Sequence, residues 1–340
     1  MKNEGVLPLP LDRPFRLFVT GPNAGNHSPL GDWTLEQPEE NVVSVVEGLR
    51  RIAPPSCRID YYDCGASIRS LNGEHVAEAA RRAAGADAAL IVVGENSLRY
   101  QNQEKTCGEN IDTSDIGLPG MQLALVQAVR AAGAPAIVAL INGRPLAVEW
   151  IAENAAALIE AWEPGCFGGL ALAEILFGAV NPSGKMPISV PRGAGHIQTI
   201  YNHKPSQYFR NYVFGKTGPL FEFGDGLSYA KFEYSDLRLP ERVAPGQDVS
   251  VRFTIRNAGE RAGEEVALVF VRDLVGSVAT PVRALKAFRR VALQPGESAA
   301  VALAIPFDSL ALYDRRMRRV VEPGKFQVFV GGLTGEFEAL

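Results

Sequence analysis

The sequence predicts two folded parts, an α/β domain built on a mostly parallel open sheet and a following all-β sandwich. In the first half, short apolar runs alternate with Ala-rich segments whose apolar residues recur at helical spacing. In the second half this alternation stops, and Pro-Gly turns precede strands of alternating character. A chain of 340 residues is long enough for two domains of ordinary size.

The first part reads as strand and helix in turn. Each apolar run ends in a Gly or a polar turn, which is typical of a buried strand. The predicted strands cover 15–21, 57–64, 88–95, 136–143 and 156–162. The predicted helices cover 40–51 and segments that begin at His75, Met121 and Gly169, and a Gly closes three of the four. This order predicts a mostly parallel sheet covered by helices on both faces.

The second part reads as strands without helices. Residues 196–231 are rich in aromatic and turn residues, which predicts an ordered connector rather than a solvated linker. The sandwich strands are predicted at 248–257, 265–273, 285–293, 298–305 and 326–332. The predicted domains are therefore 1–195 for the α/β part, 196–231 for the connector and 232–340 for a sandwich of the immunoglobulin or fibronectin type III kind.

Composition excludes several classes of function. A net charge of −4 gives no reason to expect nucleic acid or an anionic membrane as a partner, and no run of 18 apolar residues is present. The beginning of the sequence holds no apolar stretch of signal-peptide length, which predicts a cytoplasmic location unless a segment precedes it. The four Cys and four His residues lack metal-ligand spacing, so we expect buried thiols and no metal site. Neither G-x-G-x-x-G nor G-x-S-x-G occurs, so no nucleotide cofactor and no Ser nucleophile is predicted.

An acidic loop follows the predicted strand at 88–95. Ligands of open α/β sheets bind outside the carboxyl ends of the strands, and this loop lies at that edge. It carries five carboxylates, Glu95, Glu104, Glu109, Asp112 and Asp115. Two carboxylates suffice for glycoside hydrolysis, one as acid and one as base or nucleophile. The loop is therefore a candidate carbohydrate site, and the alternative is an acidic loop that is merely solvated.

Glu109 is the best candidate for chemistry within this loop. It follows Gly108, which lets the backbone turn and project the side chain. Glu104 and Glu95 remain close alternatives, although Glu95 ends a strand and could equally accept hydrogen bonds as a structural group. Asp112 and Asp115 are most simply explained as turn and helix-start residues.

The order of the segments resembles the carboxyl-terminal half of glycoside hydrolase family 3. The closing sandwich looks like the fibronectin type III-like domain of the same family. The resemblance covers nearly the whole chain. It is carried by KNEGVLPL (2–9), GPNA…LGDW (21–33), GENIDTSDIGLPG (108–120), AWEPGCFGGLALAEILFGAVNPSGKMPISVPR (161–192) and FEFGDGLSYAKFEYS (221–235).

The resemblance implies a retaining β-glucosidase or β-xylosidase type of enzyme that acts on β-linked oligosaccharides or glycosides. In this family a barrel of eight β/α units supplies the nucleophilic Asp, and a loop of the following α/β domain supplies the acid/base Glu. That Glu precedes an L-P-G helix start at the spacing of Glu109, whereas Glu104 lies five residues too far away. Thr113 stands where the family often has Arg, and the loop varies between subgroups, which leaves Glu104 open. The predicted site is Glu109 as catalytic residue with Glu104 and Glu95 as substrate-binding residues.

No eightfold β/α pattern occurs in the sequence, and KNEGVLPL, which follows the barrel in the family, begins at Lys2. Since retention needs two carboxyls about 5 Å apart, the chain is predicted to be inactive alone. A barrel domain or subunit, or a second copy, is expected on an apolar or aromatic face. The alternative is a non-catalytic module that binds glycans or docks to a separate barrel subunit. An unrelated enzyme working from the edge of the sheet is a third, weaker interpretation.

Overall fold

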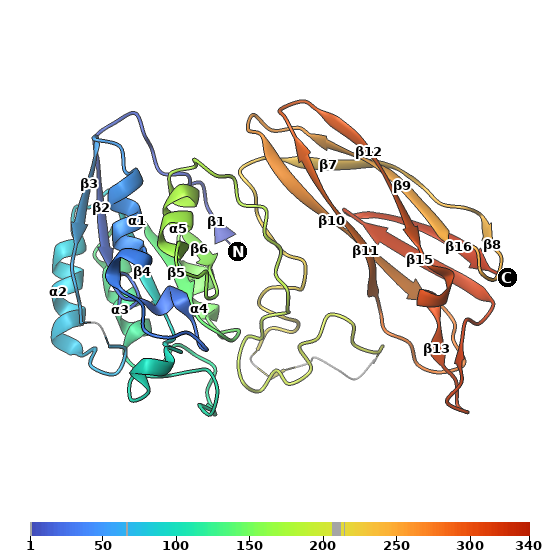
Figure 1. The fold of residues 1–340 in the computed structure, drawn as a ribbon, viewed down its shortest axis with the longest axis horizontal. Coiled ribbons are helices and arrows are strands. Elements are labelled where there is room, and N and C mark those ends of the chain that lie inside the picture. Colours follow the sequence, from blue (N-terminus) through green and yellow to red (C-terminus); the bar gives the residue numbers. More distant parts are fainter. Residues whose placement is uncertain (1, 66, 206–211, 214) are drawn as a thin grey trace. The chain divides into compact units, whose positions relative to one another are not determined.

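The computed structural model describes residues 2–65, 67–205, 212–213 and 215–340, and they form two compact units. Unit 1 holds the described residues of Met1–Val180, Val190–Ile197 and Pro219–Phe221. Unit 2 holds those of Asn181–Ser189, Gln198–Gly218 and Glu222–Leu340. The α/β part and the all-β part are both present, as predicted (Figure 1). The domain limits proposed from the sequence stay a prediction.

Unit 1 is built on a six-stranded sheet in the order β1-β6-β5-β4-β2-β3. All neighbouring strands are parallel except β1, which pairs antiparallel with β6. The strands are β1 (Lys2–Asn3), β2 (Phe15–Thr20), β3 (Cys57–Tyr61), β4 (Ala88–Gly94), β5 (Ala136–Ile141) and β6 (Ala157–Glu160). Every residue of β4 and β5 is buried, which explains why these strands read as continuous apolar runs. The predicted mostly parallel sheet is thus confirmed.

Helices cover both faces of this sheet (Figure 1). They are α1 (Val45–Ile52), α2 (Gly73–Ala83), α3 (Gln122–Ala131), α4 (Glu149–Asn154) and α5 (Gly168–Leu176), with 3-10 turns η1 (Ser28–Leu30), η2 (Glu39–Asn41) and η3 (Arg99–Gln101). Helices α2, α3 and α4 bury residues in one core cluster with β4 and β5. Helix α1 packs against α5, where a Cβ at Gly48 would lie 2.2 Å from the carbonyl oxygen of Gly169. Two glycines therefore permit this close helix pair.

Local signals in the sequence account for the ends of the helices. Helix α1 begins later than the predicted residue 40, because the Ser44 hydroxyl accepts a hydrogen bond from the Glu47 amide and caps the helix there. The glycines expected to stop three helices, Gly85, Gly133 and Gly178, all have positive φ. This conformation is the usual helix stop, as predicted.

Unit 2 is a sandwich of a five-stranded sheet, β11-β10-β15-β16-β8, and a three-stranded sheet, β12-β9-β7. The strands are β7 (Phe232–Arg238), β8 (Arg242–Val243), β9 (Val249–Asn257), β10 (Gly263–Asp273), β11 (Ala284–Leu293), β12 (Ser298–Ile305), β15 (Gly324–Val330) and β16 (Leu333–Ala339). A 3-10 turn η4 (Phe307–Leu310) and a small hairpin of β13 (Leu312–Tyr313) and β14 (Arg319–Val320) complete it. Both sheets contribute to one apolar core. All five predicted strands are present, whereas β7 and β16, which carry more polar residues, were not predicted.

The described residues between 196 and 231 form no named helix or strand, and part of the predicted connector lies outside the described residues.

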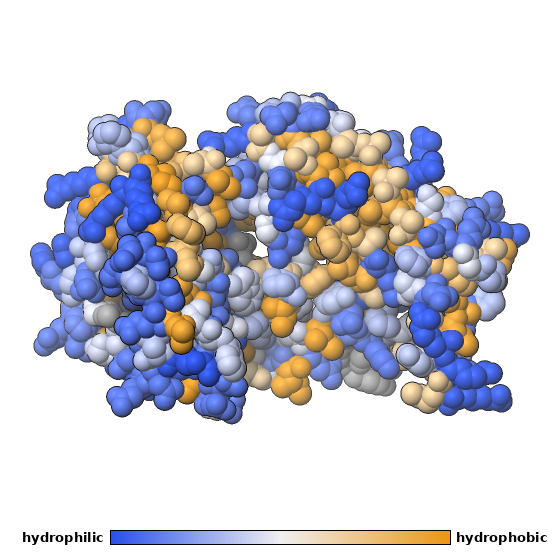
Figure 2. Space-filling model, viewed as in Figure 1, coloured by the Kyte–Doolittle hydropathy of each residue, from blue (hydrophilic) through white to orange (hydrophobic). Residues whose placement is uncertain are grey.

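Among the described residues, no helix combines the length and apolar character that crossing a bilayer requires. The four cysteines are free, and the expectation of buried thiols holds for Cys64 and Cys107, while Cys57 is half-buried and Cys166 is exposed. On the face drawn in Figure 2, hydrophobic residues are interspersed with hydrophilic ones.

Candidate functional site

The acidic loop lies at the point where the strand order of unit 1 reverses. From β2 the chain passes to β3 on one side, and it returns to β4 on the other side before it continues to β5 and β6. The loops after β2 and β4 therefore leave the same edge of adjacent strands, the usual location of a ligand site in such sheets. The buried Asn23 ties them together, because its side-chain amide donates to the carbonyl oxygens of Glu95 (3.1 Å) and Ile141 (3.3 Å).

Asp32, in the loop after β2, is the centre of a charged cluster with the acidic loop. One carboxylate oxygen of Asp32 accepts from the Glu109 amide (2.8 Å) and from Lys105 Nζ (3.3 Å). The other accepts from the Trp33 amide (2.8 Å) and from Arg99 Nε (3.2 Å). Only 11% of the Asp32 side chain is exposed. One carboxylate thus accepts four hydrogen bonds, three of which join the two loops.

The electrostatics of Asp32 follow from these contacts. Burial disfavours its ionised form, but the amides of Glu109 and Trp33 and the Lys105 ammonium outweigh burial and lower the pKa of Asp32 to about 2. Lys105 is itself 3% exposed at its side chain, and it also donates to the carbonyl oxygen of Glu109 (3.3 Å). Asp32 is therefore ionised at neutral pH and neutralises cations in the cluster.

Glu109 presents its carboxylate at the surface while its backbone is fixed. Its side chain is 45% exposed and pairs with Arg99 (2.6 Å). The preceding Gly108 has φ +94°, and a Cβ there would lie 2.5 Å from an oxygen of Asp32. The turn predicted from Gly108 is thus present, and it brings the Glu109 amide to Asp32.

Arg99 has a third contact besides its two carboxylates. Its guanidinium carbon lies 3.8 Å from the centroid of the Trp33 ring. Trp33 has φ +59° and is 73% exposed. Glu109, Arg99 and Trp33 therefore form a continuous surface feature made of an acid, a cation and an aromatic ring.

Glu95 and Glu104, the two other predicted site residues, have different surroundings. Glu95 is 5% exposed and pairs with Arg144 (3.1 Å), and burial raises its pKa, partly offset by Arg144. Arg144 also donates to the carbonyl oxygens of Thr106 and Ile111, so this pair connects the end of β4 with the middle of the acidic loop. Glu104 accepts from the Ser67 hydroxyl. The structure does not bring these two carboxylates together with Glu109 in one ion-pair cluster.

Asp115 has the turn role that the sequence predicts, whereas for Asp112 that role stays a prediction. Asp115 accepts from the Gly117 amide (2.8 Å), a turn ahead of α3. Asp112 is exposed and lines a cavity of about 310 Å³ beside the cluster. The other residues that line this cavity are Asp32, Cys107, Gly108, Ile111, Gly143, Arg144 and Glu163. A small polar ligand at the cavity would therefore touch the segments that hold Glu109.

A further carboxyl lies at the end of β6. Burial raises the pKa of Glu160 to about 7, although the Trp162 amide donates to it (3.1 Å). The side-chain oxygen Oδ1 of Asn142, which follows β5, is buried and has no hydrogen-bond partner among the described residues. Burial thus favours the uncharged form of the Glu160 carboxyl.

Asp32, Lys105 and Arg99 were not predicted as site residues. The sequence does show an Arg and a Lys inside the acidic loop and an Asp inside LGDW. Oppositely charged residues in loops at one edge of a sheet could have indicated this contact. Among the described residues, no group of His, Cys, Asp and Glu side chains could hold a metal ion.

Comparison with known proteins gives two family matches along the chain. Residues 1–229 match the glycosyl hydrolase family 3 C-terminal domain, and residues 265–334 match a fibronectin type III-like domain. A protein named beta-xylosidase from Formosa agariphila is 37% identical over 97% of the chain, which spans 46% of that protein. A periplasmic beta-glucosidase from Salmonella typhimurium is 33% identical over 95% of the chain, which spans 45% of it. The chain thus spans less than half the length of these relatives.

Solved structures give the same result. The chain matches over its whole length a beta-glucosidase from Listeria innocua in complex with isofagomine, with a TM-score of 0.89, 32% identity and 48% of that chain covered. A beta-glucosidase involved in saponin metabolism from intestinal bacteria matches with a TM-score of 0.90 and 29% identity, and 52% of that chain is covered. Both units therefore have counterparts in single relatives.

Proposed function

The chain belongs to glycoside hydrolase family 3, and from this premise we propose that it is the part of a retaining, exo-acting β-glycosidase that provides the general acid/base carboxyl. The proposed substrates are β-glucosides or β-xylosides, the two classes after which its relatives are named. Glu109 protonates the leaving oxygen and later activates water, and the nucleophile comes from a barrel domain or subunit.

The observation that carries this proposal is the contrast among the three predicted glutamates. Glu109 is 45% exposed on a backbone fixed by Asp32, at the edge where ligands of such sheets bind. Glu95 is buried against Arg144, and Glu104 is bonded to Ser67. A general acid has to reach the leaving oxygen, and Glu109 combines access with a fixed position. Substrate binding by Glu95 and Glu104 remains part of the proposal, with Glu95 acting through Arg144 and the loop.

Arg99 is the group that Glu109 has to leave before it acts as an acid. A carboxylate bonded to a guanidinium is in its base form, and the acid form requires a proton in place of that contact. Arg99 keeps Asp32 and the Trp33 ring as partners when Glu109 turns away. We therefore expect substrate to separate Glu109 from Arg99.

A second carboxyl has to come from outside this cluster. Asp32 is unsuited to be the nucleophile because its oxygens already accept hydrogen bonds from two backbone amides and contact two cations.

Large apolar side chains are exposed in the loops after β2 and β6, namely Trp33 (73%), Leu35 (81%) and Phe167 (65%). They support a partner on this edge, either a barrel or a second copy of the chain. The 340-residue chain alone is expected to show negligible turnover of an aryl β-glucoside, and clear turnover would overturn this point.

The proposed role of Glu109 can be tested in a chimera in which this chain replaces the aligned half of a family 3 β-glucosidase. Glu109→Ala should abolish turnover of a glucoside with a poor leaving group, because no proton reaches the leaving oxygen. It should retain the first step on 2,4-dinitrophenyl β-glucoside, which needs no proton. Glu104→Ala, in the same loop, distinguishes substrate binding from acid catalysis, because loss of a binding contact should affect both substrates equally. The opposite pattern would transfer the role to Glu104.

A glycan-binding or docking module is the second candidate, and the exposed Trp33 ring is the observation that favours it. Sugar rings stack on such aromatic surfaces. Binding of a β-linked oligosaccharide by the chain alone, lost in both Trp33→Ala and Glu109→Gln, together with an inactive chimera, would favour this module. The cytoplasmic location predicted from the sequence remains a prediction, since one relative is named as periplasmic.

A further inference from the structure

Unit 2 contains a cavity of about 340 Å³, and every residue that lines it belongs to this unit. It is lined by the ends of β10 and β11, by η4 and β13, and by residues 278–281. Its apolar wall is made by Val271, Leu310 and Phe326, each at most 7% exposed. A volume of this size is at the lower end of that of small-molecule sites, which suits a single sugar ring.

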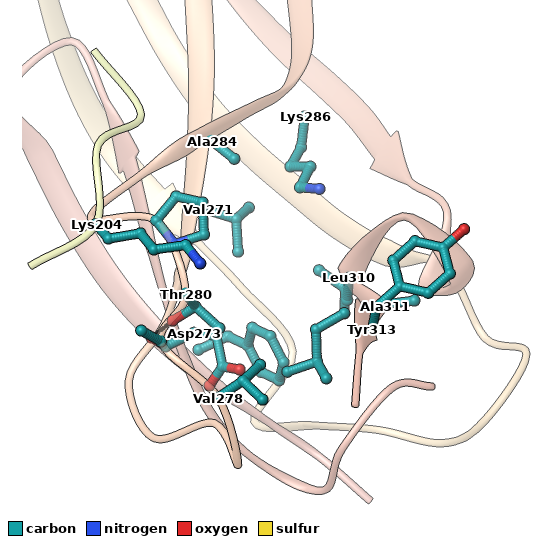
Figure 3. Close-up of a pocket in the computed structure, with 14 residues that line it drawn as sticks. Lys204, Val271, Asp273, Val278, Thr280, Ala284, Lys286, Leu310, Ala311 and Tyr313 are labelled. Atoms are coloured by element: carbon teal, nitrogen blue, oxygen red, sulfur yellow. Dashed lines mark hydrogen bonds between the residues drawn. The ribbon is translucent and has the colours of Figure 1, made fainter. Parts of the chain in front are cut away.

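Two lysines enter this cavity from different segments. Lys286 comes from β11 and Lys204 from the chain ahead of the sandwich (Figure 3). In this view Asp273 and Thr280 lie on the side of Lys204, while Tyr313 lies at the other end. A positive and a negative group thus line one small space with an apolar wall.

Lys286 is the group that points to an anionic ligand. It is half-buried, and its ammonium donates to the carbonyl oxygen of Ser309. Burial, with a smaller contribution from Arg319, lowers the pKa of Lys286. Among the described residues no carboxylate lies within ion-pair distance of its ammonium, in contrast to the buried Lys105 and the partly buried Lys185. A carboxylate bound here would provide the missing counter-ion.

Asp273 provides the second polar contact. One of its oxygens accepts from the Val275 amide (3.1 Å), and its backbone carbonyl accepts from the Thr280 hydroxyl (3.3 Å). The carboxylate lines the cavity and can accept hydrogen bonds from ligand hydroxyls. A ligand that matches both ends carries a carboxylate for Lys286, hydroxyls for Asp273 and an apolar ring face for the wall.

We propose that this cavity binds a hexuronic acid, free or as the terminal residue of an acidic glycan, with its carboxylate on Lys286 and its hydroxyls toward Asp273. The argument rests on unit 2 alone and is independent of the role of Glu109. If this unit belongs to a glycosidase, the cavity would hold acidic side groups of the polysaccharide while the neutral chain is hydrolysed elsewhere.

The test is binding of sodium glucuronate to the 340-residue chain at constant ionic strength, measured by calorimetry and by NMR of the protein amides. Glucuronate should bind at least about tenfold more tightly than glucose, and more tightly than acetate or phosphate. Lys286→Gln should weaken glucuronate binding by about tenfold or more and leave the circular dichroism spectrum unchanged. Lys325→Gln removes the same charge from an exposed position of β15 next to Phe326 and should have no effect.

Three results would overturn the proposal. They are equal affinity for glucose and glucuronate, acetate or phosphate binding as tightly as glucuronate, and loss of binding in Lys325→Gln to the same extent as in Lys286→Gln. An oligosaccharide with a terminal glucuronate distinguishes the two sources of the ligand. Tighter binding than free glucuronate assigns the site to a glycan, and weaker binding assigns it to the free acid.

Discussion

Asp32→Asn isolates the contact that holds Glu109 in place. Asp and Asn side chains have the same shape, but Asn replaces one carboxylate oxygen by an NH2 group. In either orientation this group faces two donors, either the Glu109 amide and Lys105 or the Trp33 amide and Arg99, so two hydrogen bonds are lost. The ordinary pKa of an Asp is 3.8, and that of Asp32 is about 2. This difference corresponds to about 2 kcal/mol of stability at neutral pH, and to about 1–2 kcal/mol once solvent screening at the open edge is included.

The assay for this variant is amide hydrogen exchange over residues 105–112. If Asp32 fixes the loop, the Glu109 amide should exchange about 5–30-fold faster in Asp32→Asn at pH 7. Because the pKa of Asp32 is lowered in the fold, its contribution is complete above pH 4 and is lost as the pH falls toward 2. The difference between the variant and the native chain should therefore shrink below pH 4.

Asp112→Asn is the matched control, since Asp112 is an exposed carboxylate of the same loop. It should leave exchange at Glu109 unchanged. Unchanged exchange in Asp32→Asn, or an equal acceleration in Asp112→Asn, would refute the argument that Asp32 holds the two loops together.

Three other predictions concern the frame of the site, and urea denaturation measures each of them. Arg144→Met should lower the free energy of unfolding by about 3–5 kcal/mol, because it leaves Glu95 buried without a counter-ion. The double variant with Glu95→Gln should be less destabilised. Equal destabilisation of the single and the double variant would contradict the ion-pair argument. Glu160→Gln should raise stability by about 2–3 kcal/mol at pH 8, since the raised pKa of Glu160 makes the native fold lose stability as the pH rises from 4.5 toward 7. A native chain with equal stability at pH 5 and pH 8 would contradict that expectation. Gly48→Ala should lower the free energy of unfolding by about 1–3 kcal/mol through the close contact with Gly169. Gly73→Ala should leave the free energy of unfolding unchanged, because no atom lies within 4 Å of the added Cβ. Equal effects of the two substitutions would refute the packing argument.

Much of the fold of unit 1 could be predicted because its strands are buried on both faces. A run such as Ala136–Ile141 shows this directly in the sequence. Helix α4 (Glu149–Asn154) was not predicted, since six residues are too few to reveal a helical period. Strand β1 has two residues and is defined by its partner β6 rather than by its own pattern. Short elements of this kind depend on contacts that the local sequence does not contain.

The candidate site was predictable in its acids but not in its architecture. The five carboxylates of the loop are visible in the sequence, and Gly108 indicates the turn that presents Glu109. The different surroundings of these acids depend on distant partners. Asp32 lies 77 residues before Glu109, and Arg144 lies 49 residues after Glu95. No local pattern pairs residues over such separations. The end of a strand suggested a structural role for Glu95, but the sequence could not name Arg144 as its partner or Asp32 as the partner of the Glu109 amide.

Azide rescue of Glu109→Ala in the chimera is the most direct test of the central claim. When the acid/base carboxylate is removed, azide can attack the glycosyl-enzyme without base assistance and is not repelled by a negative charge. The proposed role predicts that azide restores turnover of 2,4-dinitrophenyl β-glucoside and that the product is β-glucosyl azide. Rescue in Glu104→Ala instead, or glucose as the sole product of Glu109→Ala in azide, would contradict the assignment of Glu109 as the general acid/base.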